Sequence, residues 1–144
     1  MMFDDIIDEF SDLWKLLASP SKKEKVKQEY PRIERLNNME IEIIEIVYYK
    51  KDVILKEICT MLDIPKSTLT SAIDRLEKLN YVNRTISKRD RRSYGLELTD
   101  EGYKVQNEYS AFERRLSGDI LSALDTDEEK QQLMELLRKI VDNI

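Results

Sequence analysis

The residues best suited to chemistry lie on a predicted helix from Pro65 to Leu79. Its apolar residues recur every three or four positions, which leaves one face polar. Short hydroxyls can approach base edges or phosphates without crowding, and a helix N-terminus favours phosphate. The pattern therefore favours a helix that contacts duplex DNA, although an ordinary solvated face remains an alternative for this helix taken alone. The outward residues are Lys66, Ser67, Thr68, Thr70, Ser71, Asp74, Arg75 and Lys78.

Three of the charged residues on this helix have separate expected roles. Lys66 can reach a guanine edge or a phosphate, and Arg75 is expected to clamp a phosphate. Asp74 is unfavourable beside DNA, so we expect it to pair with Lys78 or Arg75.

A second group of cations occupies the predicted loop from Ser87 to Ser93, which reads SKRDRRS. Four cations with one acid repel one another unless an anion faces them. We expect Asp90 to orient Arg92 for insertion into a narrow minor groove. Lys88, Arg89 and Arg91 would then contact phosphates. The alternative is a solvated hairpin tip.

The surrounding elements predict how these side chains are positioned. Leu55, Ile58, Cys59 and Leu62 indicate a short helix, which Asp63 and Ile64 separate from the helix at 65–79. Asn80 suits a left-handed C-cap. Residues 81–86 and 93–98 are rich in β-branched, aromatic and aliphatic residues and predict a hairpin around the basic loop. This order is a helix-turn-helix followed by a basic wing.

Further helices flank this unit. An apolar stripe predicts a helix over residues 3–18, and Ser19-Pro20-Ser21 ends it. We expect only a short helix or loop between residues 20 and 35, because Pro31 interrupts any longer helix. Capping patterns predict helices from Asn37 (with Glu40), from Thr99, and from Thr126 (with Glu129). The expected fold is mainly α with a small β-hairpin.

Composition limits the possible functions. The net charge is −5, yet residues 53–98 hold nine basic and six acidic residues. The remainder of the chain holds 15 basic and 23 acidic residues. A local basic face still attracts phosphate because salt screens distant charges. The absence of histidine, of a nucleophile motif and of a glycine-rich phosphate loop argues against an enzyme. We expect no cofactor and no metal site. A single cysteine, with no signal peptide or apolar span, favours the cytoplasm and no membrane association.

The motifs together resemble the multiple-antibiotic-resistance regulator (MarR) family of winged-helix repressors. The resemblance covers residues 36–124 and is carried by LKEI…LDIPKSTLTSAIDRLEKLNYVNR, by Asp90-Arg91-Arg92-Ser93, and by Leu98-Thr99-Asp100-Glu101-Gly102. It implies a homodimer with interleaved terminal helices, and a pseudo-palindromic operator. It also implies release by a small aromatic effector or by thiol oxidation.

Two residues depart from the family pattern. Asn80 replaces the usual glycine, which is physically harmless because Asn tolerates the left-handed conformation. The first helix lacks the family's sensor cysteine, and Cys59 lies on an inward stripe, so we expect a buried structural thiol.

We therefore interpret residues 1–144 as one subunit. Residues 36–98 would form the winged helix-turn-helix DNA-binding region, and residues 1–35 and 99–144 the helical dimerisation region. The terminal stripes hold more large apolar residues than so small a unit can bury, which favours a subunit interface over a monomer with a helical cap. A ligand pocket could form where these regions meet, with candidate lining residues Trp14, Tyr30, Tyr48, Tyr49, Tyr103 and Phe112.

The expected function is a dimeric, sequence-specific DNA-binding transcriptional regulator, a repressor, that reads the major groove with 65–79 and the minor groove with Arg92. The alternative is a winged-helix protein–protein adaptor without DNA binding.

Overall fold

The computed structural model describes residues 2–144 and confirms a mainly helical chain with one antiparallel hairpin. The helices are α1 (Phe3–Leu17), α2 (Pro20–Lys27), α3 (Pro31–Glu34), α4 (Asn38–Tyr49), α5 (Leu55–Leu62), α6 (Lys66–Lys78), α7 (Asp100–Ser122) and α8 (Asp127–Asn143), and the strands are β1 (Val82–Ile86) and β2 (Tyr94–Leu98).

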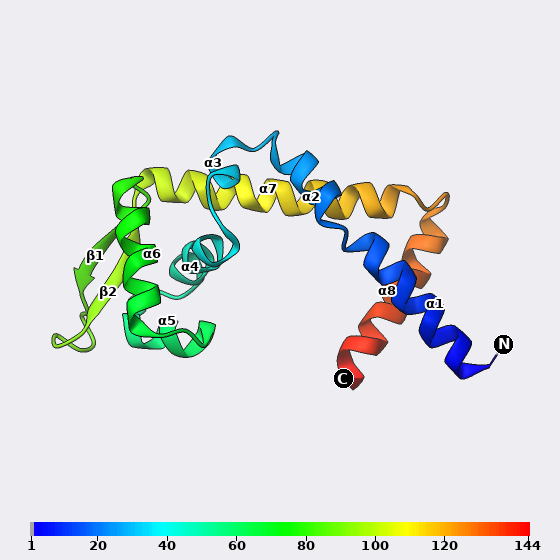
Figure 1. Cartoon of the computed structure of the whole chain (residues 1–144), viewed down its shortest axis with the longest axis horizontal. Coiled ribbons are helices and arrows are strands. Elements are labelled where there is room, and N and C mark those ends of the chain that lie inside the picture. Colours follow the sequence, from blue (N-terminus) through cyan, green and yellow to red (C-terminus); the bar gives the residue numbers. More distant parts are fainter. Residues whose placement is uncertain (1) are drawn as a thin grey trace.

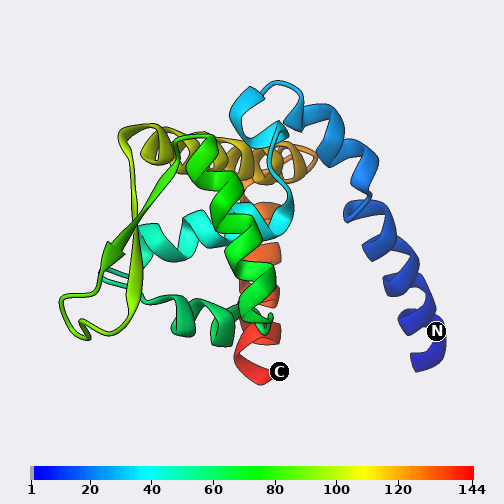
Figure 2. The same cartoon turned by 60° about the vertical axis from the view of Figure 1, so that its left-hand side comes forward.

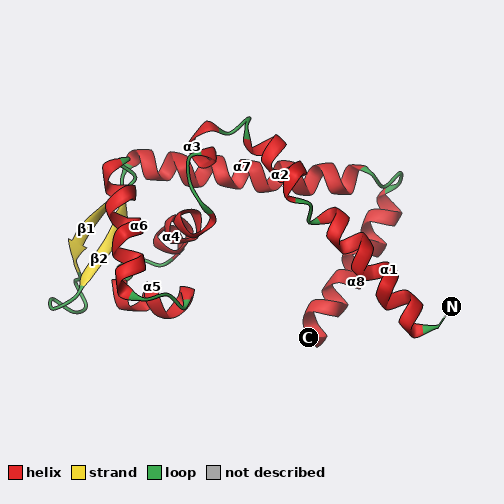
Figure 3. Ribbon diagram, in the orientation of Figure 1, coloured by secondary structure: helices red, strands yellow, loops and turns green. Residues whose placement is uncertain are grey.

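The long helix α7 connects two ends of the molecule (Figure 1). The hairpin and α6 reach the first turns of α7, and α5 lies at the opposite end of α6 (Figures 1 and 3). Helices α2 and α3 run along α7, and α1 and α8 project from its far end. Residues 20–35 form two helices, each with a proline in its first turn. Pro31 therefore starts a helix, because its missing N–H is needed by no helical partner at that position.

The predicted helix starts and stops are present. The Asn37 side chain accepts a hydrogen bond from the Glu40 amide at 2.8 Å, and the Glu40 carboxylate accepts one from the Asn37 amide at 3.0 Å. The Thr99 and Thr126 hydroxyls cap α7 and α8 by accepting from the amides of Gly102 and Glu129, without the reciprocal bond seen at Asn37. Asn80 adopts φ of 63°, the left-handed conformation expected of it after α6.

The core is built by α3 to α7 and the hairpin. Its fully buried side chains include Ile33, Ile44, Ile58, Ile73 and Val105. These residues come from five different helices, and α6 is positioned by its packing against α4, α5 and β1. Neither α1 nor α8 contributes a buried residue.

Strands β1 and β2 pair in antiparallel register, from Val82 opposite Leu98 to Ile86 opposite Tyr94. Ile54 forms an isolated β-bridge with Gly95. This bridge was not predicted from the sequence. A Cβ atom at Gly95 would lie 2.9 Å from the Val53 carbonyl oxygen, so only glycine allows the chain before α5 to approach β2 this closely.

The terminal helices leave large apolar side chains in solvent. Phe10 and Trp14 on α1 are each 60% exposed, and Leu136 on α8 is 61% exposed. The two helices overlap in Figure 1 but lie well apart when the molecule is turned in Figure 2. Their apolar faces therefore do not cover each other within one chain. Among residues 2–144, no helix has the length and apolar character needed to cross a membrane.

Candidate nucleic-acid interface

Helix α6 turns one face to the core and the other to solvent, as predicted. Leu69, Ala72, Ile73 and Leu76 are buried. Thr70 is partly buried, and its hydroxyl donates to the Lys66 carbonyl at 2.8 Å, so it offers a partner only acceptor capacity. The exposed residues that remain available are Lys66, Ser67, Thr68, Ser71, Asp74, Arg75 and Lys78.

Arg75 has a structural partner that the sequence prediction missed. Its Nη1 donates to both carboxylate oxygens of Glu40, at 2.5 Å to Oε2, and its Nη2 donates to the Arg35 carbonyl at 2.7 Å. Glu40 is only 1% exposed and also caps α4. A buried carboxylate requires a charged or hydrogen-bonded partner. Arg75 therefore joins α6 to the start of α4, while about half of its side chain remains exposed.

Asp74 pairs with neither Lys78 nor Arg75, which corrects the sequence prediction. Its partner is Arg84 on β1, whose Nη2 donates to Asp74 Oδ1 at 2.7 Å. The same guanidinium forms an ion pair with Glu77. The prediction failed because it considered only neighbours on the same helix, whereas packing brings β1 against α6.

The wing turn differs from the expected arrangement at Asp90. Asp90 accepts hydrogen bonds from the Arg92 backbone amide at 3.0 Å and from the Ser93 hydroxyl at 3.1 Å. It therefore shapes the turn and does not hold the Arg92 guanidinium. Across residues 2–144, no carboxylate lies within ion-pair distance of Lys88, Arg91 or Arg92. These three exposed cations are available to an external anion.

Arg89 points away from the wing tip, contrary to the expectation that it contacts phosphate. Its Nη2 pairs with Glu57 and donates to the Asp52 carbonyl at 2.9 Å. The Asp52 carboxylate also accepts from the Ser87 hydroxyl at 3.1 Å and from the amides of Lys88 and Arg89. Asp52 and Glu57 thus anchor the base of the wing to the turn before α5.

These contacts lower the pKa of both carboxylates, Glu57 and Asp52. Hydrogen bonds from Lys50, the Ile54 amide and Arg89 lower the pKa of Glu57 to about 2. For Asp52, partial burial raises the pKa, but hydrogen bonds from the amides of Lys88 and Arg89 outweigh it and lower the pKa. Both groups are therefore ionised at neutral pH.

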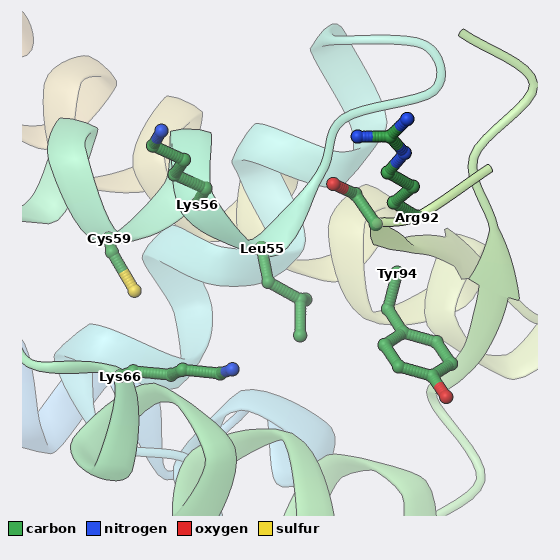
Figure 4. Close-up of a pocket in the computed structure, with 7 residues that line it drawn as sticks. Leu55, Lys56, Cys59, Lys66, Arg92 and Tyr94 are labelled. Carbon is green, nitrogen blue, oxygen red and sulfur yellow. The ribbon is translucent and has the colours of Figure 1, made fainter. Parts of the chain in front are cut away.

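Lys66 and Arg92 line one cavity of about 440 Å³, between the start of α6, helix α5 and the end of the wing (Figure 4). Leu55, Cys59 and Tyr94 are among its other lining residues. One predicted helix residue, Lys66, and one predicted wing residue, Arg92, thus border the same cavity. Cys59 packs partly against the core but also borders this cavity, so it is less buried than predicted.

A second cavity lies where α1 and α2 meet α4 and α7, which is the predicted place for a ligand. Its volume is about 270 Å³, and Lys27, Ile41, Tyr109 and Phe112 are among its lining residues. Of the aromatic candidates, Phe112 lines this cavity. The ring of Tyr30 packs on that of Phe112, with 5.6 Å between the ring centroids, and Trp14 is exposed. Burial, with the charges of Glu113, Glu45 and Glu42, raises the pKa of Tyr109 to about 12.

The residues that the sequence reading missed are Glu40, Asp52, Glu57 and Arg84. Only Glu40 carried a signal, because its capping role was recognised from its spacing to Asn37. Asp52 and Arg84 act across elements that are distant in sequence, so no local pattern marks them. Glu57 also accepts from the Ile54 amide at 3.1 Å, but its pairing with Arg89 on the wing has no local pattern.

A helix-turn-helix whose second helix is exposed, followed by a hairpin with a basic tip, defines a winged helix-turn-helix protein. The model of the MarR family matches residues 36–94, and over this region the chain is similar to the winged helix-turn-helix transcriptional regulators of that family. Among curated relatives, the HTH-type transcriptional regulator PecS of Dickeya dadantii is 39% identical over 84 residues, which are 58% of this chain. The matched region spans half the length of PecS.

Solved structures agree with this fold over the whole chain. The YusO protein from Bacillus subtilis aligns with a TM-score of 0.80 at 24% identity and covers 100% of both chains. A mutant of S. aureus MepR bound to an oligodeoxyribonucleotide aligns with a TM-score of 0.68 at 20% identity, over 92% of this chain and 96% of MepR. At these identities the structures establish the fold.

Proposed function

We propose that this chain is a dimeric, sequence-specific DNA-binding repressor of transcription that acts in the cytoplasm. The observation that supports this most strongly is that Lys66 at the start of α6 and Arg92 on the wing line the same cavity. A helix N-terminus rich in hydroxyls and a tip of unpaired cations suit base edges and phosphates. The fold shared with an oligonucleotide-bound MepR adds support.

In this proposal α6 enters the major groove and Arg92 enters the adjacent minor groove. Ser67, Thr68 and Ser71 face base edges or sugar-phosphate, and Lys88 and Arg91 contact phosphates. Arg75, Arg89 and Asp90 hold the helix and wing in place, with Arg75 exposed enough to reach a phosphate as well. The Thr70 hydroxyl bonds only within α6.

The second subunit is expected to pack on the apolar faces of α1 and α8. Two copies would place two α6 helices in successive major grooves, about 34 Å apart, on a pseudo-palindromic operator. Residues 1–35 and 99–144 would then form the dimerisation region, around the DNA-binding region at 36–98.

Selection of bound sequences from genomic or random duplexes tests the proposal. We expect an enriched inverted repeat whose binding weakens steeply with salt, because phosphate contacts release counterions. A reporter gene placed behind the selected repeat is expected to fall in expression when the protein is present. If no duplex is retained, or if binding does not respond to salt, the chain is better explained as a protein–protein adaptor.

We also propose that a small aromatic effector binds in the cavity at Tyr109 and Phe112, where ring stacking and a neutral phenol suit such a ligand. A thermal-shift screen with phenolic acids is expected to find compounds that stabilise the protein and release it from DNA. Phe112→Leu, which keeps an apolar side chain there, should weaken both effects.

A further inference from the structure

Arg84 on β1 joins two carboxylates of the exposed helix α6. Its Nη2 donates to Asp74 Oδ1 at 2.7 Å, and its Nη1 pairs with Glu77. Asp74 and Glu77 are three positions apart and therefore lie on adjacent turns of the same helix face. The planar fork of an arginine can serve both with separate nitrogens, which a lysine cannot do as well.

These two carboxylates are unexpected on a helix that is to approach DNA. The Asp74 side chain is 55% exposed and that of Glu77 is 32% exposed. An unpaired negative charge beside a phosphate costs binding free energy and slows encounter. Within residues 2–144, Arg84 is the one cation that pairs with either carboxylate, although Arg75 and Lys78 are closer in sequence.

We propose that Arg84 is a positioning residue of the nucleic-acid interface, which acts by neutralising Asp74 and Glu77 so that α6 can approach phosphates. The inference rests on the proposed function and adds to it a residue that works through the helix. Arg84 is itself only 30% exposed and already committed to two partners, unlike Arg92 at the wing tip.

Charge substitution can separate this role from two others, a direct phosphate contact and a purely structural contact. Arg84→Gln leaves both carboxylates unpaired, and we expect affinity for a short duplex of random sequence to fall about tenfold or more at low salt. Adding Asp74→Asn and Glu77→Gln to that variant removes the repulsion and should restore wild-type affinity. Arg84→Lys keeps the charge without the fork and should bind with intermediate affinity.

A matched control combines Arg84→Gln with Glu128→Gln and Glu135→Gln. These two exposed acids lie on α8, away from the hairpin and α6 (Figure 1). The net charge changes by the same amount as in the rescued variant, yet we expect binding to remain weak. Fluorescence anisotropy gives the affinities, and thermal unfolding shows that each variant is folded.

Unchanged binding by Arg84→Gln would overturn the inference. A rescued variant that binds as weakly as Arg84→Gln alone would also overturn it, because Arg84 would then contact DNA itself or act only in folding. Recovery of affinity by the control variant would show that net charge alone explains the effect, and would overturn the inference too.

If Arg84→Gln does not fold, the double variant Asp74→Asn with Glu77→Gln, in the wild-type background, decides the question. We expect that variant to bind at least as tightly as wild type, and weaker binding contradicts the proposal. A wild-type protein that binds no duplex refutes the proposed function and this inference together, a pattern distinct from all of these.

Discussion

At the scale of single residues, the cations near α6 and the wing fall into two groups. Lys66, Lys88, Arg91 and Arg92 have no ion-pair partner within residues 2–144, whereas Arg75, Arg84 and Arg89 each bind a carboxylate of the same chain. A free cation can contribute its full charge to a phosphate. A paired cation mainly fixes geometry, so substitutions in the two groups should have different consequences.

Arg92→Ala is expected to weaken operator binding by about 1–3 kcal/mol while leaving the fold intact, because its guanidinium has no intramolecular ion-pair partner. Titration of the selected duplex measures the loss, and the unfolding temperature should not change. Unchanged affinity would show that the wing tip does not enter the minor groove.

Arg75→Ala should instead destabilise the protein by about 2 kcal/mol, because it leaves the buried Glu40 carboxylate without its charged partner. The estimate is below the range for fully buried pairs, since Arg75 is half exposed. Urea unfolding measures the change. Arg91→Ala is the matched control, because it removes an exposed arginine without an ion pair and should leave stability as it is. Equal stability of the two variants would contradict the role given to the Glu40 pair.

At the scale of elements, the wing is held at its base and free at its tip. Asp52 adopts φ of 51°, which turns its carboxylate toward Ser87 and the amides of Lys88 and Arg89. The bridge from Ile54 to Gly95 lies beside this contact. The turn before α5 therefore determines the direction of a hairpin that begins about thirty residues later in the chain.

Acidification is expected to loosen the wing base. The folded-state pKa of Glu57, about 2, lies below its ordinary value of 4.5, so this contribution to stability is complete above about pH 4.5 and is lost as the pH falls toward 2. Amide hydrogen exchange of Lys88 and Arg89, corrected for the intrinsic pH dependence, should become faster over this range.

Glu57→Gln provides the control for this effect. It cannot titrate, so its wing amides should already exchange faster at neutral pH and should show a smaller pH response. If the protection of the wild-type wing amides against hydrogen exchange does not change from pH 5 to pH 2, Glu57 does not anchor the wing.

At the scale of the whole molecule, the most prominent feature of the single chain is the pair of uncovered apolar helices. They project from the end of α7 opposite the winged helix-turn-helix (Figure 1). Exposed apolar surface of this extent marks an interface. We propose a second copy as the partner, because it would also space two α6 helices for adjacent grooves.

Leu137→Glu, on the apolar stripe of α8, is expected to leave the protein monomeric, because it places a charge in the proposed dimer interface. Light scattering gives the mass. The affinity for the operator should fall as the fraction of dimer falls. The affinity of a single subunit for a duplex of random sequence should stay the same. Lys139→Glu on the same helix is exposed and outside the stripe, and should stay dimeric. A wild-type protein that is monomeric at high concentration would refute the proposed assembly.

Most local elements could be predicted from the sequence, but residues 20–35 form two helices where only a short helix or loop was expected. Apolar spacing determines α1, α5 and α6, and the caps at Asn37, Thr99 and Thr126 determine where α4, α7 and α8 begin. Both depend on residues a few positions apart, so a linear pattern records them. The basic wing and the outward face of α6 were predictable for the same reason.

The roles of individual charges were decided only by the tertiary structure. Asp74 was assigned a partner on its own helix and has one on β1, Arg89 was assigned to phosphate and binds Glu57, and Asp90 shapes a turn. An ion pair needs two groups within a few ångströms, and packing sets that distance between residues as far apart as Glu40 and Arg75. Sequence spacing determines which face of an element a charge occupies, but only the folded chain determines what lies opposite that face.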